Sequence, residues 1–173
     1  MSGFHIRKMV AGDREAVARM IFHGTNRYYE TLGKGPIFQG DELSPAIMFD
    51  VYEKMDPGEA LVAVDDDSDI VVGSCFVHPR ETHVSLGIMN CHPDHFGRGI
   101  ARSLLQRIIT DATASRKPVR LVSSCLNLDS YSLYPPRGVC AVRHLSGHDP
   151  GGTRDGSPCG QSSQGNGESC VSR

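Results

Sequence analysis

The sequence has almost no net charge and no long apolar run. Its 173 residues include 18 Lys and Arg against 20 Asp and Glu, which gives a formal net charge of -2. This balance argues against a broad electrostatic surface for nucleic acid or for an anionic membrane. No apolar stretch approaches the ~18 residues of a membrane span, and residues 1–14 are too polar for a secretory signal. We therefore expect a cytoplasmic enzyme or binding domain without a nucleic-acid or membrane partner.

The sequence also lacks a Cys-x-x-Cys pair among its six cysteines. Three of them, Cys75, Cys91 and Cys125, lie in apolar stretches, where a free thiol behaves as a small hydrophobic group. The other three, Cys140, Cys159 and Cys170, lie in a C-terminal segment of different composition. Because no secretory signal indicates an oxidising compartment, we expect reduced cysteines without a disulfide framework.

Large apolar residues are missing from the C-terminal segment, residues 135–173. Of these 39 residues, 18 are Gly, Pro or Ser, and none is Ile, Phe, Met, Tyr or Trp. Such a composition cannot bury enough apolar surface to offset the entropy lost on ordering. The sequence therefore predicts an ordered domain over residues 1–134 and a disordered tail over residues 135–173, with no strand after Tyr134.

Residues 1–134 alternate between strand-like and helix-like patterns. Apolar residues recur at helical spacing after Asp13, the predicted N-cap of a first helix, and after Pro45, the predicted first residue of a second. Strands are predicted at residues 4–9, 59–64, 70–77, 82–91 and 119–125, and further helices at 99–114 and 128–134. The order β-α-α-β-β-β-α-β-α predicts an α+β fold, a mixed β-sheet flanked by helices.

The most informative stretch runs from Cys91 to Ala101, where a predicted strand turns into a predicted helix. Gly97 and Gly99 allow the main chain to turn its N–H groups toward one point. The new helix adds free N–H groups and the positive end of its dipole, which together suit a pyrophosphate. The Gly-Lys-Ser/Thr of a Walker A loop and the third spaced glycine of a Rossmann fingerprint are absent.

In this stretch the sequence resembles the GNAT acetyltransferase superfamily. That family carries Gln/Arg-x-x-Gly-x-Gly/Ala between a strand and a helix. Gly99 and Ala101 match the pattern, and Gly97 and Arg98 precede them. Phe96 departs from the first position, where the family contacts are mainly made by backbone N–H groups.

A second block strengthens the resemblance after the predicted fifth strand. The family pattern there is Asn-x-x-Ala-x-x-Leu-Tyr, and its counterparts in this sequence are Asn127, Ser130, Leu133 and Tyr134. The two blocks occur in the order of the family, and the resemblance covers about residues 4–134.

The resemblance implies transfer of an acetyl group from acetyl-CoA to an amine within a ternary complex, by a GNAT-like domain that lacks the final strands of the family. The implied cofactor contacts are Met89, Asn90, Cys91, Gly97, Arg98, Gly99, Ile100, Ala101 and Asn127. The implied proton donor to the leaving thiolate is Tyr134, for which packing against the sheet is the other interpretation. The acceptor, a small molecule or a peptide, and the oligomeric state stay open.

Several polar residues near the turn allow more than one interpretation. Arg98 is either a contact for a phosphate of CoA or an exposed arginine. Glu81, His83 and Asn90 lie on or near the strand before the turn, and none is singled out as the general base. The four histidines between residues 78 and 95 lack the spacing of a zinc site, so no metal is expected. In the family, the region that corresponds to residues 24–41 walls the acceptor pocket.

The C-terminal segment departs from the family pattern. The family continues its last helix past the tyrosine, reaches Gly-Phe and adds two strands, whereas Pro135 and Pro136 directly follow Tyr134 here. Synonymous codons for residues 137–148 exist that give AGFVPYATYQD when read one nucleotide later, so an out-of-frame tail is one hypothesis. Two functions therefore stay open: an N-acetyltransferase, and an acyl-CoA-binding module or inactive remnant without turnover.

Overall fold

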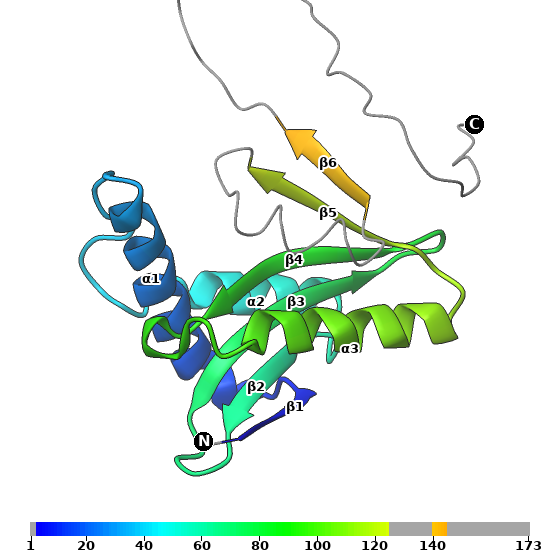
Figure 1. Ribbon diagram of the computed structural model, residues 1–173, viewed down its shortest axis with the longest axis horizontal. Helices are drawn as coiled ribbons and strands as arrows, with labels where there is room; N and C mark the ends of the chain where they lie inside the picture. The colour runs from blue at the N-terminus through cyan, green and yellow to red at the C-terminus, as the bar shows by residue number, and fades with distance from the viewer. Residues whose placement is uncertain (1–2, 125–139, 145–173) are drawn as a thin grey trace, which may run out of the picture.

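The computed structural model describes residues 3–124 and 140–144, which form both strands and helices (Figure 1). In chain order the elements are β1 (Phe4–Lys8), the short 3-10 helix η1 (Ala11–Asp13), α1 (Arg14–Thr31), α2 (Ala46–Met55), β2 (Leu61–Asp65), β3 (Val71–Pro79), β4 (Val84–Cys91), the 3-10 helix η2 (Pro93–His95), α3 (Ile100–Ala114), β5 (Val119–Ser124) and β6 (Cys140–His144). The predicted helix at residues 128–134 lies outside the described residues.

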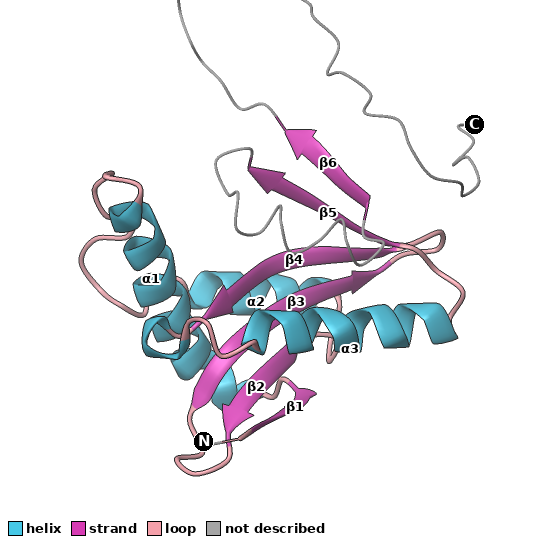
Figure 2. Ribbon diagram, in the orientation of Figure 1, coloured by secondary structure: helices cyan, strands magenta, loops and turns pink. Residues whose placement is uncertain are grey.

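The strands of the described residues form one sheet in the order β1-β2-β3-β4-β5-β6. Neighbouring strands from β1 to β4 are antiparallel, whereas β5 runs parallel to β4 and β6 parallel to β5. Helices α1 and α2 lie on one face of the sheet and α3 lies on the other (Figure 2). The predicted fold, a mixed sheet flanked by helices, is confirmed.

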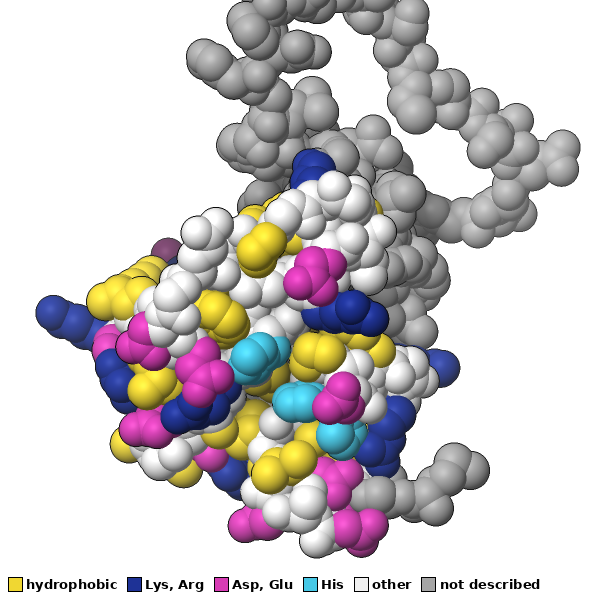
Figure 3. Space-filling model, turned by 90° about the vertical axis from the view of Figure 1, so that its left-hand side faces the viewer, with side chains coloured by type: hydrophobic (Ala, Val, Ile, Leu, Met, Phe, Trp, Pro, Cys, Tyr) yellow, Lys and Arg dark blue, Asp and Glu magenta, His cyan; other side chains and the backbone are white. Residues whose placement is uncertain are grey.

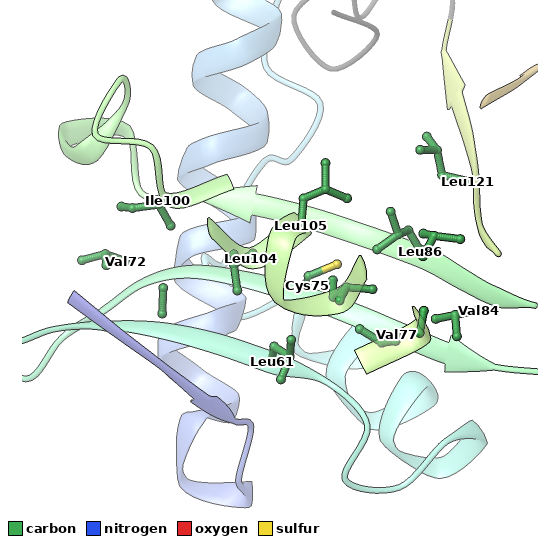
Figure 4. Packing of buried hydrophobic residues seen from close by; sticks show 14 residues of the cluster. Leu61, Val72, Cys75, Val77, Val84, Leu86, Ile100, Leu104, Leu105 and Leu121 are labelled. Carbon is green, nitrogen blue, oxygen red and sulfur yellow. The ribbon is translucent and has the colours of Figure 1, made fainter. Parts of the chain in front are cut away.

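Helix α3 packs its apolar side against the sheet (Figure 4). Leu104, Leu105 and Ile108 are at most 2% exposed and belong to a cluster that includes Leu61 and Cys75. Full burial of an aliphatic side chain of this size contributes about 1.5–3 kcal/mol relative to exposure. This burial holds α3 on β2, β3 and β4, and it therefore also positions the turn from which α3 begins.

A second apolar cluster fills the space between the opposite face of the sheet and helices α1 and α2. Val17 and Met20 of α1 and Phe49 of α2 are buried in the same cluster as Phe76 of β3. Tyr52 of α2 stacks on Phe76 with ring centroids 4.6 Å apart. Both helices predicted from apolar spacing are thus present, and no helix of the described residues is long and apolar enough to cross a membrane.

Asp13 stands directly before α1, as predicted, but its carboxylate does not cap the helix. Its two oxygens accept hydrogen bonds from both terminal nitrogens of Arg7, at 2.7 and 2.8 Å, and one also accepts from the amide of Val10 at 2.8 Å. Burial raises the pKa of Asp13, but the hydrogen bonds and the charge of Arg7 outweigh burial, and the pKa lies below its ordinary value. The predicted capping role was wrong, because the carboxylate ties β1 to the start of α1 instead.

The structure also differs from the sequence analysis after Tyr134, where no strand was expected. Cys140–His144 forms β6, which pairs with β5 from Arg120↔Cys140 to Ser124↔His144. Residues 139–142 are the longest apolar run of the C-terminal segment, and the composition of the whole segment concealed this short run. The rest of residues 135–173 lies outside the described residues.

The contact between β3 and the start of α3 depends on Gly73. A Cβ atom at this position would lie 2.4 Å from Cγ2 of Ile100 and 3.2 Å from Cδ1 of Leu104. We predict that Gly73→Ala lowers the free energy of unfolding by about 1–3 kcal/mol, because the core is already filled. Urea unfolding measures the loss. Gly12→Ala is the matched control, since its Cβ would meet nothing within 4 Å; equal stability of the two variants would contradict the prediction.

Candidate functional site

Strand β4 loses its partner on one side halfway along its length. Its pairing with β5 covers Val84↔Val119 to Leu86↔Leu121, and no further pairs join the two strands. β4 nevertheless continues to Cys91, and Figure 1 shows β5 turning away from it. In the described residues, the edge of β4 at residues 87–91, here called the free edge, therefore has no strand beside it on the β5 side. Unpaired backbone N–H and C=O groups on such an edge can bind an extended ligand.

A bulge in β4 lies where the free edge begins. Cys75 pairs with Met89 and Val77 pairs with Leu86, so the two residues at 87 and 88 oppose the single residue at 76. Such an extra residue bends a strand and increases its local twist. The bulge therefore directs the second half of β4 away from β5, while its other edge stays paired with β3.

The predicted anion-binding turn follows the free edge directly. Gly97 and Gly99 have φ values of 77° and 80°, the left-handed region that favours glycine. The first hydrogen bond of α3 joins the Ser103 amide to the Gly99 carbonyl at 2.9 Å. Among the described residues, the amides of Gly97, Gly99, Ile100 and Arg102 have no acceptor. A Cβ at Gly97 or Gly99 would meet nothing within 4 Å, so both glycines border open space. These free amides are suited to an anion.

The side chain of Arg98 turns toward the β2–β3 hairpin. Its Nη1 lies 3.5 Å from Oδ2 of the buried Asp65, and Nε2 of His95 lies 3.9 Å from the same oxygen. The other oxygen of Asp65 accepts from the amides of Asp67 and Ser68, at 3.2 and 3.1 Å. In this structure Arg98 is thus neither free in solvent nor directed at the open side of the turn, and Asp65 connects the hairpin to the turn.

Cys91, the last residue of the free edge, is held in an apolar setting. Burial raises the pKa of its thiol to about 11, against the opposing effect of a hydrogen bond from the Ala101 amide. Burial also raises the pKa of the Cys75 thiol on the neighbouring strand. A neutral thiol is a poor nucleophile, so the expectation that Cys91 does not carry the chemistry is consistent with its surroundings.

The candidate bases named from the sequence do not converge on the bulge. Glu81 and His83 lie in the turn between β3 and β4, and Nδ1 of His83 contacts the Thr82 hydroxyl at 3.1 Å. Asn90 lies on the α1 side of the sheet, near Gly24. The described residues contain no group of three His, Cys, Asp or Glu side chains that could hold a metal ion.

One buried histidine near the bulge was considered from the sequence only as part of a metal cluster. His78 of β3 has its Nδ1 2.6 Å from Oδ2 of Asp56, the residue that follows α2. Arg80 donates to both oxygens of Asp56, at 2.6 and 3.0 Å. No sequence signal identifies this contact, because Asp56 and His78 are 22 positions apart and belong to different elements.

Residues 24–41 run from the second half of α1 into the loop before α2. Asn26 holds this loop: its side chain donates to the Phe38 carbonyl and accepts from the Phe38 amide, both at 2.9 Å. Phe22 stacks on Phe38 with ring centroids 6.0 Å apart. Figure 3 faces this end of the molecule, where histidine, acidic and basic side chains gather between apolar ones. The predicted contact residue Asn127 and the predicted acid Tyr134 lie outside the described residues.

A cavity of about 280 Å³ lies elsewhere, beside the C-terminal half of α3. Its charged lining residues already have partners: Lys8 pairs with Glu59 at 3.0 Å, and the ammonium of Lys117 donates to the Arg80 carbonyl at 2.6 Å. The cavity includes neither the glycine turn nor the free edge. We therefore locate the candidate site at the free edge and the turn, where backbone groups lack partners.

Comparison with known proteins finds a family model that matches this region. Residues 56–137 match the family model of the acetyltransferase (GNAT) domain. This range contains the bulge, the free edge and the glycine turn, and the match confirms the resemblance inferred from the sequence. No curated protein matches the chain.

Solved structures share the fold at low sequence identity. A putative acetyltransferase from Pyrococcus horikoshii is 21% identical with a TM-score of 0.59, over 75% of this chain and 42% of that one. The ribosomal-protein-S18-alanine N-acetyltransferase from Escherichia coli is 15% identical with a TM-score of 0.60, over 79% and 77% of the two chains. The PaiA N-acetyltransferase from Thermoplasma acidophilum, in complex with coenzyme A, is 15% identical with a TM-score of 0.61, over 78% and 87%. This chain thus spans less than half of the Pyrococcus protein.

The raised pKa of the Cys91 thiol predicts that this side chain reacts slowly with alkylating reagents. With a pKa of about 11, the thiolate fraction at pH 8 is about 0.1%, against about a quarter for an ordinary thiol of pKa ~8.5. We predict that iodoacetamide alkylates Cys91 on the order of 10²-fold more slowly than it alkylates an unstructured cysteine peptide. Peptide mass spectrometry over time measures the rate. Alkylation at the rate of the peptide control would show that Cys91 is accessible and ionised.

Proposed function

We propose that this chain, whose residues 56–137 match the acetyltransferase (GNAT) domain, transfers an acetyl group from acetyl-CoA to the amine of an acceptor. The observation that carries the proposal is the free edge of β4, which ends at a turn whose amides lack partners among residues 3–124 and 140–144. Both halves of a CoA molecule, an extended amide-containing arm and a pyrophosphate, have a matching set of backbone groups there.

In this proposal the pyrophosphate accepts hydrogen bonds from the turn. The amides of Gly97, Gly99 and Ile100 have no acceptor within the described part of the chain, and the positive end of the α3 dipole lies at the same point. The amide of Ala101 is engaged by the Cys91 thiol and contributes less. Nη1 of Arg98 already lies 3.5 Å from a carboxylate oxygen of Asp65, so a phosphate shares or replaces this contact.

The pantetheine arm lies along the free edge and pairs with backbone groups of Met89, Asn90 and Cys91. The opposite edge of these residues is already paired with β3, so the arm replaces the missing neighbour strand. This arrangement brings the thioester toward the bulge at residues 87 and 88. Asn127 is a further cofactor contact and Tyr134 the acid for the leaving thiolate, roles proposed from the match to the family pattern.

The acetyl transfer proceeds directly between the two bound substrates. A neutral amine attacks the thioester carbonyl carbon, the C–N bond forms, and the C–S bond breaks to release CoA. Holding both reactants in place supplies on the order of 7–11 kcal/mol at best. The S18-alanine N-acetyltransferase and the coenzyme A complex among the similar structures support an amine acceptor and a CoA donor.

Binding at the turn is tested by thermal shift with acetyl-CoA. We predict a rise in Tm with ligand concentration, since a ligand at 100 times its Kd stabilises the folded state by about 2.7 kcal/mol.

Gly99→Ala should weaken binding by about tenfold or more, because a side chain at φ 80° strains the turn beside the free amides. The matched control is Gly58→Ala, which has φ 70° and the same open surroundings but lies outside the turn. Equal loss of affinity in both variants would remove the turn from the site.

Turnover is tested separately by thiol release from acetyl-CoA with a panel of amines. The panel contains peptides with a free N-terminal alanine, a lysine-containing peptide, a polyamine and an aromatic amine. We predict that at least one amine raises the release rate clearly above hydrolysis, and mass spectrometry should show one added acetyl group. Binding without release would support the alternative function, an acyl-CoA-binding module without turnover. Absence of any Tm shift with acetyl-CoA and CoA would exclude both.

A further inference from the structure

Outside the turn and the free edge, the imidazole of His78 is one of the buried polar groups of the described residues that lack a full set of partners. Its side chain is 8% exposed, and the side chain of its partner Asp56 is 11% exposed. Hydrogen bonds from Arg80 and from His78 hold the pKa of Asp56 below its ordinary value, against the effect of burial. An ionised carboxylate is only an acceptor, so the proton of this contact belongs to Nδ1, which donates to Oδ2 at 2.6 Å.

In the neutral ring that carries its proton on Nδ1, the second nitrogen, Nε2, is a proton acceptor. Nε2 is buried and has no hydrogen-bond partner among the described residues. Leaving such a group unpaired costs about 1–3 kcal/mol. The other charged or titratable side chains near the ring are Asp56, Arg80 and Tyr52, whose ring centroid is 4.9 Å from that of His78.

Nε2 points at the bulge of β4. A Cβ atom on Gly87 would lie 2.8 Å from Nε2, so the nitrogen lies directly against the main chain of Gly87. Gly87 is the first β4 residue after the last pair with β5, Leu86↔Leu121. The free nitrogen is therefore located where the free edge begins, on the face of the sheet covered by α1 and α2.

We propose that His78 accepts the proton of the acceptor amine, and that Asp56 is the positioning residue that fixes its tautomer. The inference rests on the proposed acetyl transfer. The acceptor ammonium gives one proton to Nε2, and the neutral amine then attacks the thioester carbon. As the C–S bond breaks, the CoA sulfur takes up the second amine proton. The imidazolium finally releases its proton to solvent, so one proton is set free for each acetyl group transferred.

The geometry distinguishes His78 from the bases considered in the sequence. Glu81 and His83 lie in the β3–β4 turn, before the paired part of β4, whereas Gly87 lies after it. Asn90 belongs to the free edge, but an amide side chain cannot accept a proton at neutral pH. His78 combines a fixed tautomer, an unpaired nitrogen and a place at the bulge.

The test compares His78→Gln with His83→Gln in the full chain, using the best amine of the panel. We expect His78→Gln to lower kcat by about 10²–10⁴-fold, and acetyl-CoA affinity measured by thermal shift to change by less than about threefold. The matched control His83→Gln should keep both values. Asp56→Asn should lower kcat less and move the low-pH limb of kcat/KM, which a purely structural role would not do.

A measurement on the native chain covers the case in which His78→Gln fails to fold. In the neutral imidazole of His78, assigned ¹⁵N resonances should show the proton on Nδ1, and the Nε2–H tautomer would overturn the proposal. A folded His78→Gln variant with kcat within about threefold of the native chain would also overturn it. If the native chain binds acetyl-CoA but acetylates no amine, the proposed function fails and this inference fails with it. If the native chain acetylates an amine and the His78→Gln variant does so at a similar rate, this inference fails while the proposed function stands.

Discussion

The candidate site depends on one constraint, the extra residue in β4 opposite Phe76. A sheet normally pairs both edges of a central strand, and unpaired backbone groups inside a protein are costly. Here the bulge lies next to Leu86, the last residue that pairs with β5, and among the described strands the second half of β4 keeps only its β3 partner. The fold thereby leaves a row of backbone groups available at its centre. A ligand with amide groups satisfies them without any particular side chain on β4.

The core and the site share residues, which explains how the turn is held in place. Gly73 pairs with Cys91 at the end of β4, and its bare α-carbon allows Ile100 to approach β3 closely. Ile100 is the first residue of α3 and follows Gly99 directly. Burial of α3 therefore fixes the direction of the free amides at its start. The same contact connects core packing to the proposed anion site, so we expect a change in the core at this point to affect the turn as well.

Apolar periodicity and turn residues were sufficient to predict most elements, because local pattern determines them. The strands before the tail, the first three helices and the glycine turn are all present near the expected boundaries. Features set by contacts between distant residues were not predictable. Asp13 has the residue type and position of an N-cap, but Arg7 competes successfully for its carboxylate. β6 depends on a neighbouring strand rather than on composition, and the Asp56–His78 contact has no local signature.

Two features of the contact between Asp56 and His78 lower the stability of the folded state. Asp56 stands at the C-terminal end of α2, where the helix dipole disfavours a carboxylate by about 0.3–1 kcal/mol. Nε2 of His78 adds the cost of an unpaired buried nitrogen. Arg80 offsets the first cost by neutralising the carboxylate, but nothing in the described residues offsets the second.

A sequence selected for stability alone would fill the position of His78 with an apolar side chain, since Tyr52 and Phe76 already form an apolar stack beside it. Departures from local consistency of this kind are expected where a side chain serves chemistry rather than folding. The bulge explains the location, because it is the point of the sheet where a buried side chain of β3 lies next to unpaired main chain.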